Sequence, residues 1–208
     1  MKEFWDERFS QEVYVYGEEP NVWYAEQIKN MPVGKKALFP AEGEGRNCVY
    51  AAQLGWEVTA VDISEEGRKK ALQLAQKKSV TIDYQLESVA NRDFGENQFD
   101  LIVLIFAHFP PAFRTKVHQQ FVHTLRPGGI LLMEGFHKEN LPYKLANPSI
   151  GGPGEESLLY DEELLLEDFK DLHIEHLEKE EAELKEGEFH KGKGMVIHLI
   201  AKKISNID

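Results

Sequence analysis

The 208-residue chain contains one cysteine, Cys48, and therefore cannot form a disulfide within itself. Structural disulfides are rare in reducing compartments, so this scarcity fits a cytoplasmic protein. The longest uninterrupted apolar run, residues 101–107, is far shorter than the ~20 residues that a membrane-spanning helix needs. The first residues also lack the apolar core of a signal peptide. We therefore expect a cytoplasmic protein without a membrane partner.

Positive charge is scarce as well, because 24 Lys and Arg face 36 Asp and Glu, for a formal net charge of −12. Nucleic acids and anionic membranes are bound through basic surfaces, so we expect neither as a partner. Residues 155–188 hold 15 acidic side chains against three lysines. We interpret this run as a solvated face. The remaining composition, with 42% hydrophobic residues, is typical of one globular domain.

The apolar residues alternate between strand-like and helix-like segments. We predict strands at 36–40, 57–62, 80–86, 99–106 and 130–136, and helices at 21–30, 47–54, 64–78 and 110–125. The nearly continuous apolar run at 99–106 is typical of a central parallel strand that is buried on both faces. Such alternation predicts a doubly wound α/β sheet with helices on both faces.

The last third of the chain has a different pattern. Residues 141–154 are rich in Pro and Gly and are predicted to form a loop, and residues 160–169 a helix. Residues 172–182 and 194–202 have strand character and are joined by a turn at 186–192. This arrangement predicts a terminal antiparallel hairpin.

The most informative segment runs from the strand at 36–40 through Gly43 and Gly45 to a helix, and then to a second strand that ends at Asp62. Glycines let the backbone turn sharply and let a ligand approach closely. The following helix points free N–H groups toward that ligand. A carboxylate at the end of the second strand can accept hydrogen bonds from ribose hydroxyls. These features indicate a site for a nucleoside cofactor.

Several segments in order resemble the class I S-adenosylmethionine-dependent methyltransferases. They are Glu-Gly-Glu-Gly-Arg-Asn47, the strand end at Asp62, Phe99-Asp100 and Leu-Arg-Pro-Gly-Gly129. Other segments resemble the tellurite-resistance and thiol-methyltransferase-like branch more closely. These are Phe-Trp-Asp-Glu-Arg-Phe9, Tyr-Gly-Glu-Glu-Pro-Asn21, Phe-Ala-His-Phe-Pro-Pro111, the Gly-Gly-Pro153 loop and Glu-Gly-Glu-Phe-His-Lys-Gly192. The resemblance covers nearly the whole chain.

The resemblance implies a Rossmann-like sheet of seven strands, mostly parallel, with the last strand inserted antiparallel. It also implies S-adenosylmethionine as the cofactor and a small-molecule methyl acceptor, with a thiol or chalcogenide as the expected class. The whole chain, 1–208, would be one domain. Residues 1–30 would form an N-terminal lid and helix, 35–136 the cofactor-binding core, and 137–208 a substrate-shaping loop and the hairpin.

The first loop departs from the family pattern, which has an acidic residue at the end of the first strand and three glycines. Phe39 and Pro40 occupy the strand end, and Ala41 replaces the first glycine. We expect Glu42 to substitute for the missing acid by accepting a hydrogen bond from the cofactor's ammonium group. The alternative is a glutamate that faces solvent.

The resemblance places the cofactor against a defined set of residues: Tyr16, Ala41, Glu42, Gly43, Gly45, Asn47, Asp62, Ile63, Ser88, Val89 and Phe106. Asn47 could equally have a capping or packing role, and Ser88 and Val89 could form a plain loop. Trp5, Tyr14 and Tyr16 could close over the site, because aromatic faces attract a sulfonium cation. They could also only pack on the core.

His108 and His190 are the candidate catalytic residues, because histidine titrates near neutral pH and can deprotonate or orient an acceptor. A surface histidine in a hairpin turn is the alternative for His190. The other histidines show no metal-binding spacing, and Cys48 is expected to be a small buried residue.

Two other functions share parts of this pattern. A nicotinamide-dependent oxidoreductase would have a similar loop, but the third glycine of its motif would fall at Cys48. The second is a protein that binds S-adenosylmethionine without catalysing methyl transfer. The altered end of the first strand is compatible with it.

Overall fold

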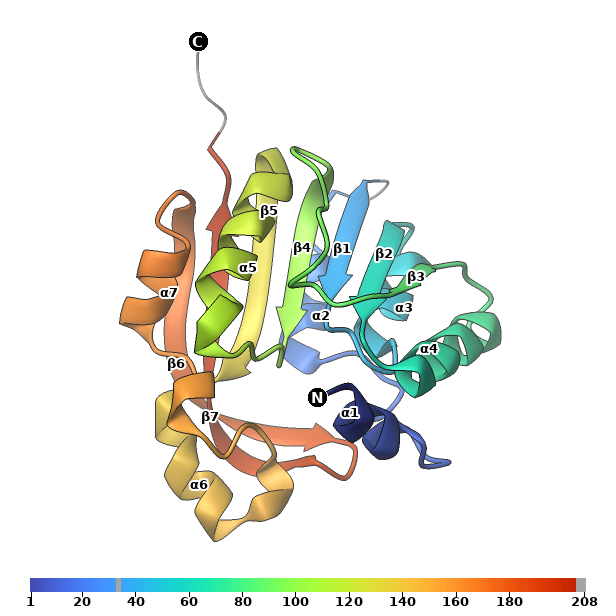
Figure 1. The fold of residues 1–208 in the computed structure, drawn as a ribbon, viewed down its shortest axis with the longest axis vertical. Coiled ribbons are helices and arrows are strands. Elements are labelled where there is room, and N and C mark those ends of the chain that lie inside the picture. Colours follow the sequence, from blue (N-terminus) through green and yellow to red (C-terminus); the bar gives the residue numbers. More distant parts are fainter. Residues whose placement is uncertain (33–34, 205–208) are drawn as a thin grey trace.

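The computed structural model describes residues 1–32 and 35–204, so the predicted regions 1–208 and 137–208 extend past the last described residue. Its centre is a seven-stranded sheet in the order β3-β2-β1-β4-β5-β7-β6 (Figure 1). The strands are β1 (Lys36–Pro40), β2 (Glu57–Asp62), β3 (Asp83–Leu86), β4 (Phe99–Ile105), β5 (Leu125–Phe136), β6 (His173–Glu186) and β7 (His190–Lys202). Neighbouring strands from β3 to β5 are parallel, and β7 is antiparallel to both β5 and β6. The predicted mixed sheet is confirmed.

Several strand boundaries differ from those predicted. β3 begins at Asp83 rather than at residue 80, because Ser79 has a positive φ of 58° and the Val80 N–H bonds the carbonyl of Ala75. These two residues therefore cap the preceding helix. β5 begins at Leu125, which pairs with Phe99. In the hairpin, Glu186 pairs directly with His190, so only residues 187–189 form the turn that was predicted at 186–192.

The helices are α1 (Lys2–Phe9), α2 (Val22–Ile28), α3 (Arg46–Gln53), α4 (Glu65–Lys77), α5 (Pro111–Thr124), α6 (Leu141–Ala146) and α7 (Glu162–Asp168). α1 was not predicted. α6 and a 3₁₀ turn at Pro148–Ile150 lie within the segment predicted as a loop, so that prediction was wrong in part. Helices α1 and α6 are short, and short helices gain their stability from tertiary contacts, which the local sequence does not reveal.

The two faces of the sheet bury separate hydrophobic clusters. Leu38 points to the face that is covered by α5 and α7, where Phe121 and Phe169 are fully buried. Its neighbours on β1, among them Phe39, point to the opposite face, which is covered by α2, α3 and α4. This alternation is the period-2 pattern of a strand buried on both sides.

Both unpredicted helices lie at the carboxyl edge of the sheet. The β6–β7 hairpin extends past the other strands at this edge and curves beneath them, with α6 on one side and α1 on the other (Figure 1). The order of strands reverses between β1 and β4. Doubly wound sheets bind ligands outside such a reversal, at the carboxyl ends of the strands.

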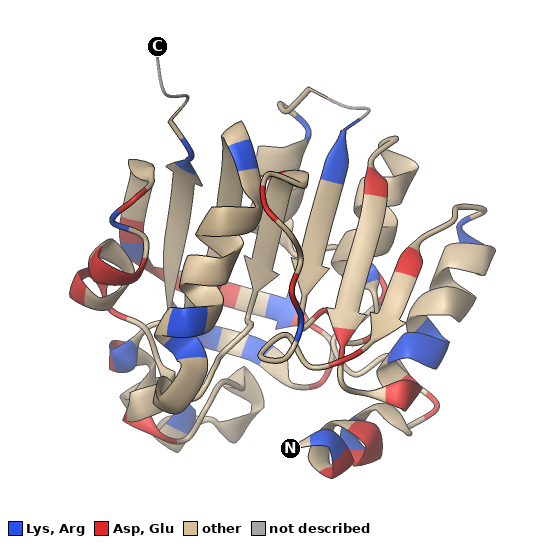
Figure 2. Ribbon diagram, turned by 45° about the horizontal axis from the view of Figure 1, so that its top comes forward, with Lys and Arg blue, Asp and Glu red and all other residues tan. Residues whose placement is uncertain are grey.

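The acidic run at 155–188 is largely solvated, as predicted. Figure 2 shows that α7 is mostly acidic on its outer surface. Two carboxylates of the run at 155–188 are exceptions, because Asp168 and Glu186 are only 6% and 8% exposed. Asp168 accepts hydrogen bonds from Thr115 and pairs with His118. The interpretation as a solvated face was therefore wrong for these two carboxylates.

Candidate cofactor and acceptor site

A cavity of about 590 Å³ opens at the carboxyl ends of β1 and β4. Its wall combines the loop after β1, the ends of β2, β3 and β4, the helix α1, and the hairpin turn. It brings together all but one of the predicted site residues: Tyr16, Ala41, Glu42, Gly43, Asn47, Asp62, Ile63, Ser88, Val89, Phe106, His108 and His190. Residues far apart in the sequence thus share one cavity that has the size of a small-molecule site.

Gly45 is the exception, because it lies outside the cavity wall. A Cβ on Gly45 would come within 2.5 Å of the Ala71 Cβ, and its φ is +90°. The glycine therefore permits close packing of α3 against α4. Gly43 has the same left-handed conformation, and a Cβ there would come within 2.9 Å of the Phe9 ring. Ala41 keeps a φ of 54°, so the loop retains a glycine-like path without the glycine.

Asp62 holds the loop between β1 and α3, residues 41–45, in place. Its Oδ2 accepts a hydrogen bond from the Gly43 N–H at 3.0 Å, and its Oδ1 accepts one from the Ser64 N–H at 2.8 Å. Burial raises the pKa of Asp62, although both N–H bonds favour the ionised form. Each carboxylate oxygen has a second lone pair, so Asp62 can still accept hydrogen bonds from a ligand in the cavity.

Glu42 caps α3 with one oxygen and leaves the other without a protein partner among the described residues. Its Oε1 accepts hydrogen bonds from the N–H groups of Asn47 and Cys48 at 3.0 and 2.8 Å. Burial raises the pKa of Glu42 to about 7 in spite of these bonds and of the nearby Arg46 charge. The expected alternative, a glutamate that faces solvent, does not fit this placement.

Asn47 has the packing role that the sequence left open. Its Oδ1 accepts a hydrogen bond from the Asn21 N–H at 2.9 Å, which ties the segment before α2 to the start of α3. Asn47 also lines the cavity, as do Ser88 and Val89 beyond the end of β3. Whether these residues contact a cofactor stays a prediction.

His108 lies at the cavity wall with both ring nitrogens occupied. Its Nδ1 lies 2.8 Å from the Leu158 carbonyl oxygen, and its Nε2 accepts a hydrogen bond from the Phe136 N–H at 3.2 Å. Burial lowers the pKa of His108 to about 4. A neutral ring with Nδ1 protonated satisfies both bonds. This geometry favours a role in holding the loops after β4 and β5 over one in proton transfer.

His190 has one nitrogen bound and the other free. Its Nδ1 lies 3.3 Å from Glu186 Oε2, whereas the structure describes no hydrogen bond to its Nε2. The rings of Tyr16 and Phe106 contact it, at centroid distances of 4.5 and 4.3 Å. Burial lowers the pKa of His190 although Glu186 favours its charged form. A neutral, oriented imidazole at the cavity wall can accept a proton.

Arg46 keeps Glu186 ionised. Its Nη2 lies 2.7 Å from Glu186 Oε2, and both side chains are buried. Burial opposes the charge on Glu186, but Arg46 and His190 outweigh it and lower the pKa of Glu186 to about 2. Glu186 therefore stays ionised beside the imidazole, with its charge paired by Arg46.

Asn21 connects this arrangement to a second buried carboxylate. Its Nδ2 donates to Glu186 at 2.9 Å and to Glu134 at 3.0 Å, and its Oδ1 accepts from the Tyr24 N–H. Glu134 in turn lies 2.9 Å from His198 Nε2. One amide therefore joins α2, β5 and the hairpin, and every polar atom of its side chain has a partner.

The aromatic N-terminal segment closes one side of the cavity. Trp5 and Tyr16 line it, whereas the Tyr14 hydroxyl donates to the Lys70 carbonyl on α4 and lies outside. The buried Glu44 accepts hydrogen bonds from the N–H groups of Val15 and Tyr16 and pairs with Lys70 at 2.8 Å. The expected lid thus holds for Trp5 and Tyr16 and is wrong for Tyr14.

Four residues of the site were not predicted from the sequence, namely Arg8, Glu44, Lys144 and Glu186. A signal existed for Glu186, because a three-residue hairpin turn places it directly opposite His190. No local pattern pointed to Arg8 or Lys144, which reach the cavity from the two helices that were not predicted.

Within residues 1–32 and 35–204, no three His, Cys, Asp or Glu side chains gather as a metal site. In the same part of the chain, no helix is both long and apolar enough to cross a membrane. Cys48 is a free, fully buried thiol.

Comparison with known proteins agrees with this geometry. Residues 40–129 match a family model described as a methyltransferase domain. No curated protein matches the chain in sequence.

Among solved structures, one described as "Conversion of a Disulfide Bond into a Thioacetal Group during Echinomycin Biosynthesis" has a TM-score of 0.79 and 16% identity, covering 99% of this chain and 93% of the other. TehB from Haemophilus influenzae has a TM-score of 0.71 and 18% identity, covering 97% and 66%. A SAM-dependent methyltransferase from Methanosarcina mazei has a TM-score of 0.68 and 19% identity, covering 86% and 97%. Residues 40–129 therefore match a methyltransferase domain, and the chain has the Rossmann-like fold of the class I S-adenosylmethionine-dependent methyltransferases.

Proposed function

We propose that this protein transfers a methyl group from S-adenosylmethionine to a small-molecule acceptor, and that the acceptor atom is a thiol or another chalcogen. The observation that carries the proposal is the shared cavity. The glycine loop with Asp62 and the imidazole of His190, with its free Nε2, line this one cavity.

The residues present fit the cofactor. Asp62 has free lone pairs for ribose hydroxyls, and Glu42 Oε2 is available to an ammonium group. Gly43 leaves the loop without a Cβ, and the rings of Tyr16 and Phe106 can lie against a cationic sulfonium. When bound, the cofactor supplies an electrophilic methyl group with a neutral leaving group.

The protein would then mainly align the acceptor and exclude water. His190 Nε2 would accept the acceptor's proton, and Glu186 would hold the ring in position through Nδ1. A thiol requires little more, because a thiolate is already a strong nucleophile near neutral pH. One structural neighbour supports a sulfur acceptor by analogy, because its description names the conversion of a disulfide bond into a thioacetal group.

Cofactor binding without turnover is the second candidate. Phe39 at the end of β1, where the family has an acid, is the observation that favours it. We also propose a cytoplasmic location and no nucleic-acid or membrane partner, on the basis of the charge balance and the single cysteine.

The test is calorimetric titration of the protein with S-adenosylhomocysteine and with NADH. We expect S-adenosylhomocysteine alone to bind. Asp62→Ala should weaken this binding roughly 10- to 100-fold, as expected for hydrogen bonds to a charged group. Asp171→Ala, which removes an exposed carboxylate far along the chain, serves as the control. Unchanged affinity in Asp62→Ala, or binding of NADH in place of S-adenosylhomocysteine, would contradict the proposal.

A further inference from the structure

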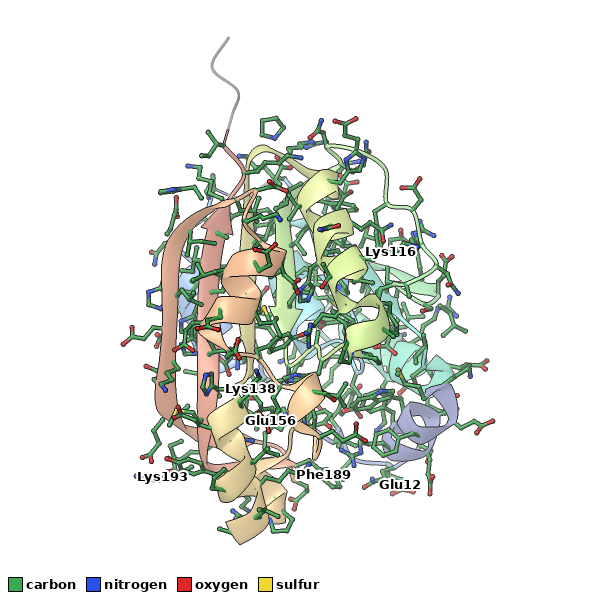
Figure 3. The ribbon with its side chains drawn as sticks, turned by 60° about the vertical axis from the view of Figure 1, so that its left-hand side comes forward. Glu12, Lys116, Lys138, Glu156, Phe189 and Lys193 are labelled. Carbon is green, nitrogen blue, oxygen red and sulfur yellow. The ribbon has the colours of Figure 1, made fainter. Side chains whose placement is uncertain are left out.

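The outer part of the cavity carries two cationic side chains that the proposed reaction does not use. Arg8 reaches it from α1, and Lys144 reaches it from α6. We call this part the acceptor lobe and define it by α1, α6, residues 148–158 and Phe189. Figure 3 shows Phe189 at the tip of the hairpin, between the region of α6 and that of α1.

Arg8 is held in place by aromatic contacts. Its guanidinium carbon lies 4.5 Å from the centroid of the Phe189 ring and 4.7 Å from that of Phe4. Its Nη1 donates to the Tyr16 hydroxyl at 3.1 Å, and the structure describes no other hydrogen bond from this side chain. A guanidinium has five N–H groups, so most of its donors remain available in a fixed orientation.

Lys144 is half-buried and also retains free donors. Its Nζ donates to the Gly152 carbonyl, which uses one of three N–H groups. Burial lowers the pKa of Lys144, and the positive charge of Arg8 lowers it further. Two like charges therefore lie within electrostatic reach of each other across the acceptor lobe. This repulsion would be relieved by an anion between them.

The other charged side chains around the cavity have partners. Glu44 pairs with Lys70, Arg46 with Glu186, and Glu87 with Arg92. Glu42 and Asp62 accept backbone N–H bonds at the cofactor end. Among the described residues, Arg8 and Lys144 are the cavity-lining Lys and Arg side chains without a carboxylate within ion-pair distance. The acceptor lobe is thus selectively positive in a chain whose net charge is −12.

The rest of the lobe is apolar. Aromatic rings form much of the cavity wall, namely Phe4, Phe109, Phe113, Phe136 and Phe189, and Phe4 and Phe189 belong to the acceptor lobe. Phe4 is exposed at 52%, which is unusual for a large apolar side chain and places an apolar surface at the entrance. Aromatic walls favour a flat apolar ligand, because offset and edge-to-face contacts add to the burial of apolar surface.

We propose that the acceptor is an organic anion, with a flat apolar body between these aromatic walls and a negative group that binds Arg8 and Lys144. This inference rests on the proposed function, because it concerns the acceptor of that reaction. The negative group recognised here is separate from the atom that is methylated at His190.

The experiment compares two small molecules with the same body, 4-nitrobenzoate and its uncharged amide 4-nitrobenzamide, in calorimetric titrations. Each is titrated into the protein alone and into the protein saturated with S-adenosylhomocysteine. We expect 4-nitrobenzoate to bind at least tenfold more tightly than the amide, and its affinity to fall as salt screens the charges. Lys144→Met and Arg8→Met should each remove most of this preference, and Arg8→Lys should restore part of it.

Lys116→Met is the matched control, since Lys116 lies on α5, at a separate place from Phe189 in Figure 3. It should leave the preference unchanged. Equal binding of the two molecules, no binding of either, or the same loss in Lys116→Met would overturn the inference. Competition by inorganic phosphate as strong as by 4-nitrobenzoate would also overturn it, because the apolar body would then contribute nothing. S-adenosylhomocysteine binding is measured separately, so failure of the proposed function would be recognised independently.

Discussion

At the scale of single residues, the site depends on buried carboxylates that both hold the backbone and can bind a ligand. Asp62 and Glu42 each use backbone N–H groups to fix the loop and still face the cavity. A negative charge on each carboxylate favours ligand binding. The same charge lowers the stability of the ligand-free protein, because burial disfavours ionisation. Stability and binding are therefore expected to oppose each other at these positions.

Glu42→Gln should stabilise the ligand-free protein at pH 8 and weaken its binding of S-adenosylhomocysteine. The pKa of Glu42 is raised to about 7, from an ordinary value of 4.5. When the pKa of an acid is higher in the folded state than in the unfolded state, the free energy of unfolding falls as pH rises from the unfolded-state pKa to the folded-state pKa. The unfolded chain ionises freely, whereas the folded state has to carry a buried charge. Gln removes this charge and can still accept the N–H bonds of Asn47 and Cys48.

The measurement for Glu42→Gln is the melting temperature of both proteins at pH 5 and at pH 8, together with calorimetry. We expect the difference between variant and wild type to appear at pH 8 and to shrink at pH 5. A variant that is less stable at pH 8, or that binds S-adenosylhomocysteine as tightly as wild type, would show that Glu42 has no such role.

Glu186→Gln should lower kcat by roughly tenfold if His190 is the base that Glu186 orients. The pKa of His190 is already lowered by burial, and loss of the Glu186 charge should lower it further. The acid limb of the pH profile should therefore lie below pH 6.5 in the wild type and move to lower pH in the variant. Glu188→Gln, on the same turn and exposed, is the control. An unshifted profile would leave Glu186 with only a structural role.

At the scale of elements, a buried ion pair helps to attach the N-terminal segment to the loop after β1. Glu44 is 4% exposed, and it joins residues 15–16 to Lys70 on α4. Through Glu44 and Lys70, the N-terminal segment, the loop after β1 and α4 are held together, although no hydrophobic pattern in the sequence connects these three segments. Closure of the cavity therefore depends on electrostatics as well as on the packing of Phe9 against Gly43.

Lys70→Met should destabilise the protein by about 3–5 kcal/mol, because it leaves Glu44 buried without its partner. The double variant Glu44→Gln, Lys70→Met should recover part of this loss. Chemical denaturation measures both effects, and hydrogen exchange at the Val15 amide reports on release of the segment. Lys69→Met removes the neighbouring exposed cation and should change neither. Slow exchange at Val15 in Lys70→Met would mean that packing alone holds the segment.

At the scale of the whole molecule, a ligand that bridges these elements should stabilise them together. Saturation of a site at 100 times its Kd adds about 2.7 kcal/mol to the free energy of unfolding. For a chain of this size, that corresponds to a rise in Tm of roughly 5–10 °C. We expect this rise with S-adenosylhomocysteine and none with NADH, measured by differential scanning calorimetry. A rise with NADH alone would contradict the assignment of the cofactor.

The sequence by itself determined the alternation of strands and helices and the position of the glycine-containing loop after β1. Apolar runs of strand length, glycines before a helix and an acid after the second strand are local patterns, and each reflects backbone sterics or burial within a few residues. The β6–β7 hairpin was predicted for the same reason, although its turn was placed too widely. Gly43, Asp62 and Val89 lie at or just after the carboxyl ends of β1, β2 and β3. Because these strands are parallel, the three residues meet in the cavity wall.

Only the tertiary structure decided how the candidate site is completed. Arg8 and Lys144 reach the acceptor lobe from α1 and α6, short helices that form because the rest of the fold supports them. The structure also distinguished His190, which keeps a free nitrogen, from His108, whose nitrogens both bind backbone groups. Hydrogen bonds between residues as distant as Asn21, Glu134 and Glu186 depend on three-dimensional proximity. No local pattern in a single sequence carries that information.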